Sequence, residues 1–315
     1  MKIENKKITI LGGGISGIGA AQLASYLGAI VFISDRKDIT EIQDLPSKVK
    51  FEIGGHSNKC YDCDLAIISP GIDYNHTFIE KFKELRIPIV NEIEFAYMFT
   101  SGKIISITGS NGKSTVAKLL TKVLKHKYKN IFLGGNIGIS FSRNVLKELK
   151  NNFKNVIHIL ELSSFQLENI NSFKSDISCF LNITEDHINR HKTFENYFLA
   201  KKKIIKNFTK GSYFLYNEDD SLLKEEFESN KLFTPYSISN CNNRIIANGT
   251  SIIDTIDNKE IFNYTNSQLE GKHNLENIVA IIHIAKELNV ENKIIRKSIK
   301  KFKPLEHRLE KLVFN

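Results

Sequence analysis

The chain has 315 residues, enough for two domains at the usual ~150 residues each. Its hydrophobic content of 41% and charged content of 25% are those of a soluble globular protein, and no apolar run reaches the ~18 residues of a membrane span. The start, "MKIENKKITIL", leads directly into an apolar strand and not into a signal peptide, so we expect a cytoplasmic protein without a membrane partner. The net charge is +9, but the lysines are scattered and not interleaved with arginine and aromatic residues. We therefore expect a solvated surface and no nucleic-acid partner, with attraction of anionic phosphate substrates as an alternative.

The four cysteines are expected to be reduced thiols. Cys60 and Cys63 have the spacing of half a zinc site, but a structural zinc site needs four ligands and no second close pair follows. The pair also lacks the position between a strand and a helix that a thioredoxin-type motif has.

The N-terminal residues predict a βαβ unit that binds a nucleotide diphosphate. The strand "ITIL" precedes Gly12-x-Gly14-x-x-Gly17, a helical apolar pattern follows, and Asp35 ends the second strand. Glycines in such a turn let the backbone approach a diphosphate, although they could instead only allow close packing of the helix on the strand. A later strand ends in a Pro-Gly loop, where parallel sheets place ligands. The candidate binding residues are Gly14, Ile15, Ser16, Gly17, Asp35, Arg36 and Gly71.

A second α/β series begins near residue 100. Nearly continuous apolar runs predict strands of a mostly parallel sheet that is covered on both faces. These strands are expected at 130–135, 156–162 and 177–183. Residues 240–266 predict short β segments, and 272–288 predict a strong amphipathic helix. The expected fold class is α/β, with a Rossmann-like domain at 1–99 and a P-loop domain at 100–303.

Residues 106–120, "SITGSNGKSTVAKLL", predict a phosphate-binding loop. The usual spacing, G-x-x-x-x-G-K-[ST], would need glycine where Ile107 stands. Backbone N–H groups of residues 109–112 and the helix N-terminus could hold a triphosphate, while Lys113 would supply charge and Ser114 a hydroxyl for Mg²⁺. A capped Gly-Asn turn would also tolerate this loop, but it does not explain a Lys-Ser pair at the helix start. The candidate ATP-binding residues here are Gly109, Ser110, Asn111, Gly112, Lys113, Ser114 and Thr115.

This loop and six further motifs resemble the Mur ligase superfamily, whose members are ATP-dependent amide-forming ligases. The family's loop is G-x-x-G-K-[ST], which accounts for the missing glycine. The Ser-Asn-Gly-Lys-Ser version is most similar to members that add D-glutamate. The other motifs, in the family's order, are "GGNIG", "ELSSFQLE", "NITEDHINRH", "YFLAK", "HNLEN" and "EHRLE". Together they extend the resemblance over nearly the whole chain.

The resemblance also implies metal ligands and catalytic residues. Glu161 follows an apolar strand, where a carboxylate is either a surface residue or a hard oxygen ligand for Mg²⁺. Lys201 stands in a charge run that is ordinarily solvated; as a carbamate it would ligate metal, which requires a lowered lysine pKa. The implied metal ligands are Ser114, Glu161, His187 and carbamylated Lys201. The implied catalytic residues are Lys113, His187 and Lys201.

Substrate and nucleotide contacts follow from the same motifs. The resemblance places Asn136 and Ser163 near the muramoyl substrate, and Asn274, Asn277 and Arg308 near the nucleotide. Asn274 and Asn277 lie three apart on one helical face, although helix capping is an alternative for Asn274.

His187 and His191 are four apart, which is a zinc-binding spacing on a helix. Ile188 stands where H-E-x-x-H needs glutamate, so the zinc protease pattern fails. His191 is therefore expected to be a surface side chain.

The implied reaction joins D-glutamate to UDP-N-acetylmuramoyl-L-alanine through an acyl phosphate, with ATP and Mg²⁺ as cofactors and the uridine diphosphate held by the first domain. The family has a third domain after its His-Arg motif, so residues 304–315 are expected to be the start of a truncated C-terminal domain, which a partner could complete. Glu306 departs from the family's usual proline. Three alternatives stay open: a non-catalytic two-domain remnant, a dinucleotide oxidoreductase, and a superfamily ligase for another amino acid.

Overall fold

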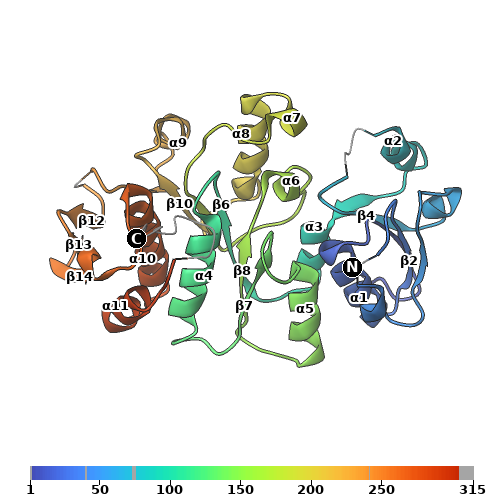
Figure 1. Cartoon of the computed structure of the whole chain (residues 1–315), viewed down its shortest axis with the longest axis horizontal. Coiled ribbons are helices and arrows are strands. Elements are labelled where there is room, and N and C mark those ends of the chain that lie inside the picture. The colour runs from blue at the N-terminus through green and yellow to red at the C-terminus, as the bar shows by residue number, and fades with distance from the viewer. Residues whose placement is uncertain (1, 40, 73–75, 241, 305–315) are drawn as a thin grey trace, which may run out of the picture.

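Figure 1 shows the computed structural model of the chain, which describes all residues except 1, 40, 73–75, 241 and 305–315. The described residues form two parallel β-sheets in succession and a small antiparallel sheet near the C-terminal end. Helices flank the parallel sheets, as their continuous apolar strands predict (Figure 1). The predicted α/β fold with mostly parallel sheets is confirmed. Within these residues, no helix has both the length and the apolar character needed to cross a membrane.

The first sheet has the strand order β3-β2-β1-β4-β5, and all neighbouring strands are parallel. Its chain order reverses between β1 and β4, and ligands of such sheets lie at the carboxyl ends of those strands. The strands are β1 (Lys7–Leu11), β2 (Ile30–Ser34), β3 (Lys50–Glu52), β4 (Leu65–Ile68) and β5 (Ile89–Asn91). The helices are α1 (Ile15–Tyr26), α2 (Thr77–Glu84) and α3 (Glu92–Tyr97), with 3₁₀ turns at Ile42–Asp44 and Asn58–Tyr61.

The second sheet has the order β11-β10-β9-β6-β8-β7, again with parallel neighbours, and β6 occupies its reversal point. The strands are β6 (Lys103–Thr108), β7 (Ile131–Gly135), β8 (Ile157–Glu161), β9 (Ile177–Phe180), β10 (Tyr213–Asn217) and β11 (Thr234–Tyr236). The helices are α4 (Lys113–Leu124), α5 (Phe141–Lys150), α6 (Ser164–Leu167), α7 (Ile188–His191), α8 (Phe194–Lys202) and α9 (Ser221–Phe227), with a 3₁₀ turn at Lys203–Ile205. The ends of β6, β8 and β9 therefore meet at one edge of the sheet.

The C-terminal elements confirm the short β segments predicted for residues 240–266. They are β12 (Ile245–Asn248), β13 (Ser251–Asp254) and β14 (Lys259–Asn263), followed by a 3₁₀ turn at Tyr264–Asn266, α10 (Lys272–Glu287) and α11 (Asn292–Lys300). α10 matches the predicted amphipathic helix, and it packs against α4. It therefore brings its first turns close to the loop that precedes α4.

Helices α1, α3 and α5 join the two parallel sheets. Ile18, Phe95 and Phe141, one from each helix, are fully buried in an apolar cluster that continues onto the second sheet. The carboxylate of Glu94 in α3 also accepts backbone N–H groups of residues 171–173. This joint is apolar and densely hydrogen-bonded, so it fixes the orientation of the first sheet relative to the second.

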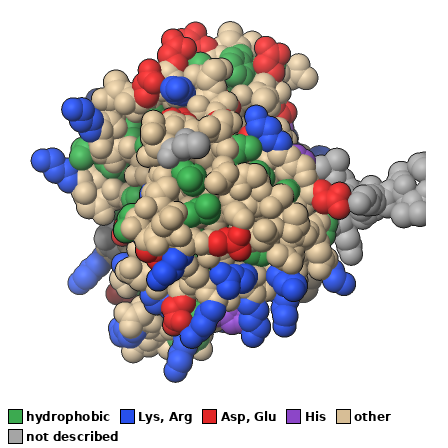
Figure 2. Space-filling model, turned by 90° about the vertical axis from the view of Figure 1, so that its left-hand side faces the viewer, with side chains coloured by type: hydrophobic (Ala, Val, Ile, Leu, Met, Phe, Trp, Pro, Cys, Tyr) green, Lys and Arg blue, Asp and Glu red, His purple; other side chains and the backbone are tan. Residues whose placement is uncertain are grey.

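One group of basic residues lies on the face formed by the C-terminal elements. Figure 2 shows Lys and Arg side chains on the lower part of the face formed by the C-terminal elements, where α11 lies. The Lys122 ammonium in the last turn of α4 donates to the Lys301 carbonyl at 2.7 Å, which ties this end of α4 to the end of α11. α4 begins at the loop and is about 18 Å long at 1.5 Å per residue. This part of the basic surface therefore lies at the end of α4 that is remote from the loop, and attraction of anionic phosphate substrates by the net charge stays a prediction.

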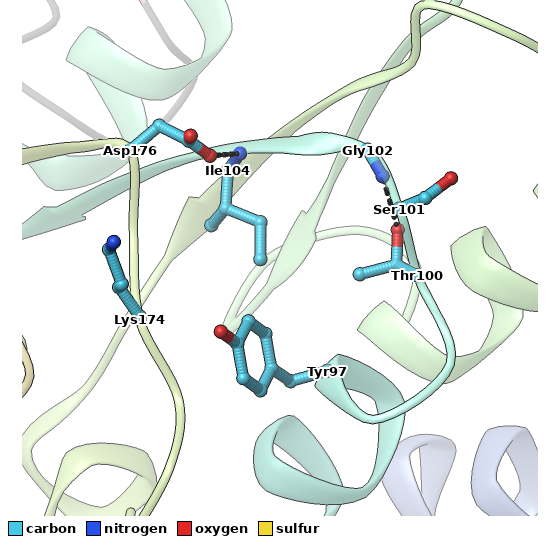
Figure 3. Close-up of a pocket in the computed structure, with 7 residues that line it drawn as sticks. All are labelled: Tyr97, Thr100, Ser101, Gly102, Ile104, Lys174 and Asp176. Carbon is cyan, nitrogen blue, oxygen red and sulfur yellow. Dashed lines mark hydrogen bonds between the residues drawn. The ribbon is translucent and has the colours of Figure 1, made fainter. Parts of the chain in front are cut away.

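A cavity of about 210 Å³ lies at the amino end of β6, on the edge opposite to the loop (Figure 3). Its polar groups serve the local backbone. The Asp176 carboxylate accepts the Ile104 N–H at 2.8 Å, and the Thr100 hydroxyl accepts the Gly102 N–H at 3.0 Å. The cavity is thus part of the junction between the sheets.

Three cysteines, Cys60, Cys63 and Cys179, are free thiols, as predicted, whereas Cys241 lies outside the described residues. Burial raises the pKa of Cys60 to about 12, so its thiol stays protonated at neutral pH.

Candidate active site

The loop between β6 and α4 is held in place by the segment that follows β9. The N–H groups of Ser110 and Asn111 donate to the carbonyl and the side-chain oxygen of Asn182, at 3.0 and 2.8 Å. The Ser110 hydroxyl donates to the Thr184 carbonyl at 2.9 Å. Of the backbone donors predicted for a triphosphate, Ser110 and Asn111 therefore have protein acceptors already, and phosphate would have to displace Asn182 to use them. The first turn of α4, with Ser114 and buried Thr115, supplies further donors because helix N-termini lack intrahelical acceptors.

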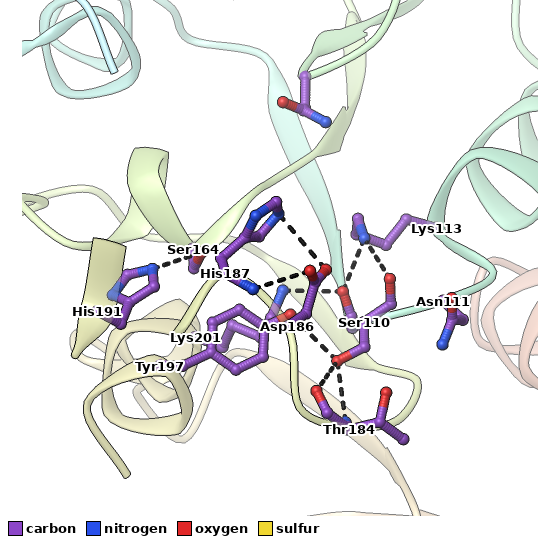
Figure 4. A network of polar contacts seen from close by, with 12 residues as sticks. Ser110, Asn111, Lys113, Ser164, Thr184, Asp186, His187, His191, Tyr197 and Lys201 are labelled. Atoms are coloured by element: carbon purple, nitrogen blue, oxygen red, sulfur yellow. Dashed lines mark hydrogen bonds and ion pairs between the residues drawn. The ribbon is translucent and has the colours of Figure 1, made fainter. Parts of the chain in front are cut away.

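Two lysines meet on one carbonyl of this loop (Figure 4). The Lys113 ammonium donates to the carbonyls of Gly109 and Ser110 at 2.8 and 2.9 Å. The Lys201 ammonium, from α8, donates to the same Gly109 carbonyl at 2.8 Å and lies 4.8 Å from the ring centre of Tyr197. Burial, with the nearby Lys113 charge, lowers the pKa of Lys201 to about 7. A sizeable share of Lys201 is therefore neutral at physiological pH, as carbamate formation requires.

A carboxylate stands next to the start of α4. Glu161 ends β8 and is 2% exposed. Its two side-chain oxygens accept the Ser114 hydroxyl at 2.7 Å and the Asn136 amide at 3.0 Å. The structure thus brings together two of the predicted metal ligands and one predicted substrate residue.

His187 lies on the other side of the loop, next to Asp186 (Figure 4). Its backbone has a left-handed φ of 53°, and its Nε2 is 3.4 Å from the Asp186 carboxylate. Its side chain is 50% exposed. Among the described residues, no three His, Cys, Asp or Glu side chains gather as a metal-binding group, so metal binding by His187 stays a prediction.

The prediction that His191 is a surface side chain is wrong. The residue is 6% exposed, its Nε2 lies 2.9 Å from the Ser164 hydroxyl, and its ring stacks on Phe165 at 5.3 Å. Burial lowers the pKa of His191, so the ring is held neutral. His191 therefore supports α6 and α7 from inside.

The nucleotide residues predicted on α10 separate into two environments. Asn277 is buried, and a methyl group added to Gly112 would lie 2.5 Å from its Oδ1, so its side chain lies directly beside the loop. Asn274 is half-buried, and its amide donates to the Glu270 carbonyl at 2.7 Å, which fits the capping alternative. Arg308 lies outside the described residues.

Ser163 caps the short helix α6. Its hydroxyl accepts the Gln166 N–H at 3.3 Å, while the Gln166 side chain accepts the Ser163 N–H at 3.0 Å. This reciprocal pair is a capping box, which occupies the hydroxyl with local bonding. A substrate contact by Ser163 stays a prediction.

The first sheet carries a pocket of about 490 Å³ at its reversal point, where the loops after β1 and β4 meet. The predicted residues that line it are Gly14, Ile15, Ser16, Asp35, Arg36 and Gly71. Asp35 accepts the Gly13 N–H at 2.6 Å, so its carboxylate also shapes the glycine turn. Gly17 does not line the pocket. A methyl group on Gly17 would lie 1.8 Å from the Gly12 carbonyl oxygen, so close packing of α1 on β1 requires glycine there.

Comparison with known proteins decides the family. The family model "Mur ligase middle domain" matches residues 107–285, more than half of the chain, and the model "MurD N-terminal domain" matches residues 7–77. The chain belongs to the Mur ligase family. This assignment replaces the alternative of a dinucleotide oxidoreductase.

Individual members show how far the similarity extends. The UDP-N-acetylmuramoylalanine–D-glutamate ligase of Christiangramia forsetii is 39% identical over 318 residues, and that of Lachnoclostridium phytofermentans is 35% identical over 322 residues. Both alignments cover 98% of this chain and 70% of the relative. The UDP-N-acetylmuramate:L-alanyl-gamma-D-glutamyl-meso-diaminopimelate ligase of Neisseria meningitides superposes with a TM-score of 0.68 at 16% identity, over 96% of this chain and 99% of that one. At that identity the superposition shows a shared fold.

Four residues of the site were not predicted. Asn182 and Asp186 lie in the quoted "NITEDHINRH" segment, and Tyr197 begins "YFLAK". Arg190 contacts the loop of the first-sheet pocket. The signal for the first two was their position after the apolar strand β9, since ligands of parallel sheets bind at the carboxyl ends of the strands.

Proposed function

We propose that this protein is an ATP-dependent ligase that joins D-glutamate to UDP-N-acetylmuramoyl-L-alanine in peptidoglycan precursor synthesis. One observation carries the proposal. Lys113, Ser114 and Glu161 meet at the reversal point of the second sheet, in a Mur ligase whose relatives carry that ligase name. A charged phosphate loop with a carboxylate beside it is suited to phosphoryl transfer.

We propose a division of labour between the two sheets. Residues 1–99 would bind the uridine diphosphate part in the 490 Å³ pocket, and residues 100–303 would bind ATP. The two family models, at residues 7–77 and 107–285, support this division. Residues 305–315 lie outside the described part of the chain.

The residues present fit a magnesium ion. A carboxylate and a hydroxyl are hard oxygen ligands, and those of Glu161 and Ser114 are 2.7 Å apart at the start of α4. Ser114 and Glu161 would hold Mg²⁺, joined by carbamylated Lys201 and His187. Bound there, the ion would neutralise phosphate charge.

The chain's own groups would act as follows. Lys113 would bind the transferring phosphoryl group and stabilise its developing charge. Asn136, held between Glu161 and the end of β7, would orient the muramoyl part. The alanine carboxylate would attack the γ-phosphorus and form an acyl phosphate with release of ADP. The uncharged amine of D-glutamate would then attack the carbonyl carbon, and phosphate would leave as the amide forms.

Phosphate release in the presence of ATP, UDP-N-acetylmuramoyl-L-alanine and D-glutamate tests this proposal. We expect release to require all three compounds, and L-glutamate, L-alanine and diaminopimelate to replace D-glutamate poorly. Turnover with another of these amino acids would identify the alternative superfamily ligase. Binding of ATP and the uridine nucleotide without turnover would identify the non-catalytic alternative.

A further inference from the structure

Arg190 crosses from the second sheet's helices to the substrate pocket of the first sheet. It belongs to α7, and its guanidinium donates to the Ile72 carbonyl at 3.0 Å and to the Gly71 carbonyl at 3.5 Å. Gly71 and Ile72 both line the 490 Å³ pocket. Arg190 thus holds one wall of the pocket from outside.

Arg190 also contacts an aromatic residue, Phe165, next to the candidate active site. Its guanidinium carbon lies 5.4 Å from the ring centre of Phe165, a distance suited to cation–π contact. The same Phe165 ring lies 5.0 Å from His187 and 5.3 Å from His191. Arg190 therefore connects the pocket wall to the aromatic group on which His187 rests.

The chemistry of arginine suits this connection. A planar guanidinium can stack on a ring while its N–H groups point at two carbonyls, which an ammonium cannot do. Both acceptors are backbone carbonyls, so the contact fixes the shape of the Gly71–Ile72 turn. It does not depend on which side chains the turn carries. The side chain is 24% exposed, so these bonds are partly shielded from water.

Arg143 provides a contrast on the same pair of sheets. This residue of α5 donates to Glu41 at 2.6 Å and to Asp44 at 3.1 Å, so it too bridges the two parts of the molecule. Neither carboxylate lines the pocket. Arg143 is therefore a matched control that bridges the sheets without touching the pocket wall.

We propose that Arg190 is a positioning residue that sets the Gly71–Ile72 wall relative to His187, so that a uridine-diphosphate substrate bound in the pocket presents its other end to the phosphate loop. The inference rests on the proposed function for the identity of that substrate. In this role Arg190 would act through the pocket wall and not by binding ATP.

Amide hydrogen exchange in the full chain without ligand tests the contact itself. We expect Arg190→Met to raise exchange in residues 69–72 at least fivefold, because the turn loses its two donors. Arg143→Met should leave that segment unchanged. Arg190→Lys, which keeps the charge but not the fork, should give an intermediate result. Unchanged exchange in Arg190→Met would overturn the inference.

Ligand binding and steady-state kinetics test the consequence. We expect Arg190→Met to weaken UDP binding and raise KM for the uridine substrate about tenfold, because the pocket wall loses both of its guanidinium donors. The Kd for ATP should change less than twofold, and kcat should fall less than KM rises. Wild-type affinity for UDP in this variant, or an equal loss of ATP affinity, would overturn the inference. Absence of UDP binding by the wild-type chain would instead overturn the proposed function, and the substrate role of Arg190 with it.

Discussion

The two proposed ligand sites of this molecule differ in how their phosphate-binding groups are partnered before a ligand binds. In the second sheet, Lys113 and Lys201 already bind the Gly109 carbonyl, and Ser110 and Asn111 already donate to Asn182. In the first sheet, the glycine turn after β1 lines an open pocket of about 490 Å³. The site on the second sheet holds its charges against its own backbone, whereas the site on the first sheet offers backbone groups and an open pocket.

This difference follows from burial. A charged group away from water needs a partner, because an unpaired buried charge costs several kcal/mol. Lys201 is 2% exposed, so its ammonium needs a protein partner even without ligand. Ile15 in the pocket is apolar and 53% exposed, so it needs no polar partner. We therefore expect a nucleotide at the loop to replace the protein partners of these lysines and N–H groups. A ligand in the pocket should mainly displace water. Substitutions at the loop and at the pocket should therefore have different effects.

The largest effect is expected at the charged site. Lys113→Met removes the ammonium that we propose to lie beside the transferring phosphoryl group, so we expect kcat to fall about 10²–10³-fold, as for loss of one preorganised transition-state donor. UDP binding should stay within twofold. Phosphate release and calorimetry measure the two quantities.

Lys118→Met is the matched control, because Lys118 is an exposed lysine on the same helix. It should leave both quantities unchanged. Equal turnover in the two variants would contradict a role for Lys113 in phosphoryl transfer. The loop of the second sheet would then have no catalytic charge to distinguish it from the pocket of the first sheet.

A smaller effect is expected from the glycines of the open pocket. Gly17→Ala places a methyl group 1.8 Å from the Gly12 carbonyl oxygen, so α1 must move off β1, and overpacking of this kind costs about 1–3 kcal/mol of unfolding free energy. Gly14→Ala meets nothing within 4 Å and should change stability by less than about 0.5 kcal/mol. Chemical denaturation measures both.

UDP affinity separates the roles of the two glycines further. Gly14 lines the pocket and is exposed, so Gly14→Ala should weaken UDP binding in a stable protein. A Gly17→Ala protein as stable as the wild type would show that the glycine turn can shift to accommodate the methyl group at little cost in free energy.

Most of the fold could be predicted because its strands are apolar runs with clear ends. The strands at β1, β4, β7, β8 and β9 and the helix α10 lie where those patterns placed them. Short edge strands such as β3 and β5, three residues each, carry too few residues for a periodic signal. The joint through α1, α3 and α5 could not be predicted either, since it depends on which faces two separate sheets bury against each other.

The site was predictable to the extent that its motifs sit at strand ends. Ser114 and Glu161 could be expected to meet because β6 and β8 are parallel neighbours. The burial of His191 could not, because four residues of helix do not show which side faces inward without Phe165 in place. The same holds for Gly17, for which the sequence favoured phosphate binding over close packing, whereas the structure shows close packing against the Gly12 carbonyl.

The smallest expected effect concerns the protonation of Lys201, which differs between the folded and the unfolded chain. Its pKa is about 7 in the folded protein and near 10.5 when exposed, because burial and Lys113 oppose its charge. Between pH 7 and 10.5 the unfolded chain therefore binds more protons at this residue than the folded chain does. Unfolding free energy should consequently rise with pH over this window, by at most about 1.4 kcal/mol per pH unit from this group.

Lys201→Met should remove that rise, because methionine does not titrate. Lys202→Met is the control, since Lys202 is the neighbouring lysine and is 37% exposed. Denaturation between pH 7 and 9 in buffer free of carbon dioxide measures the slopes, because carbamate formation would otherwise replace the amine. Equal slopes in the wild type and Lys201→Met would mean that Lys201 keeps its proton in the fold. In that case the neutral amine needed for carbamate formation would be scarce near pH 7, and the charged site would hold two full cations against one carbonyl.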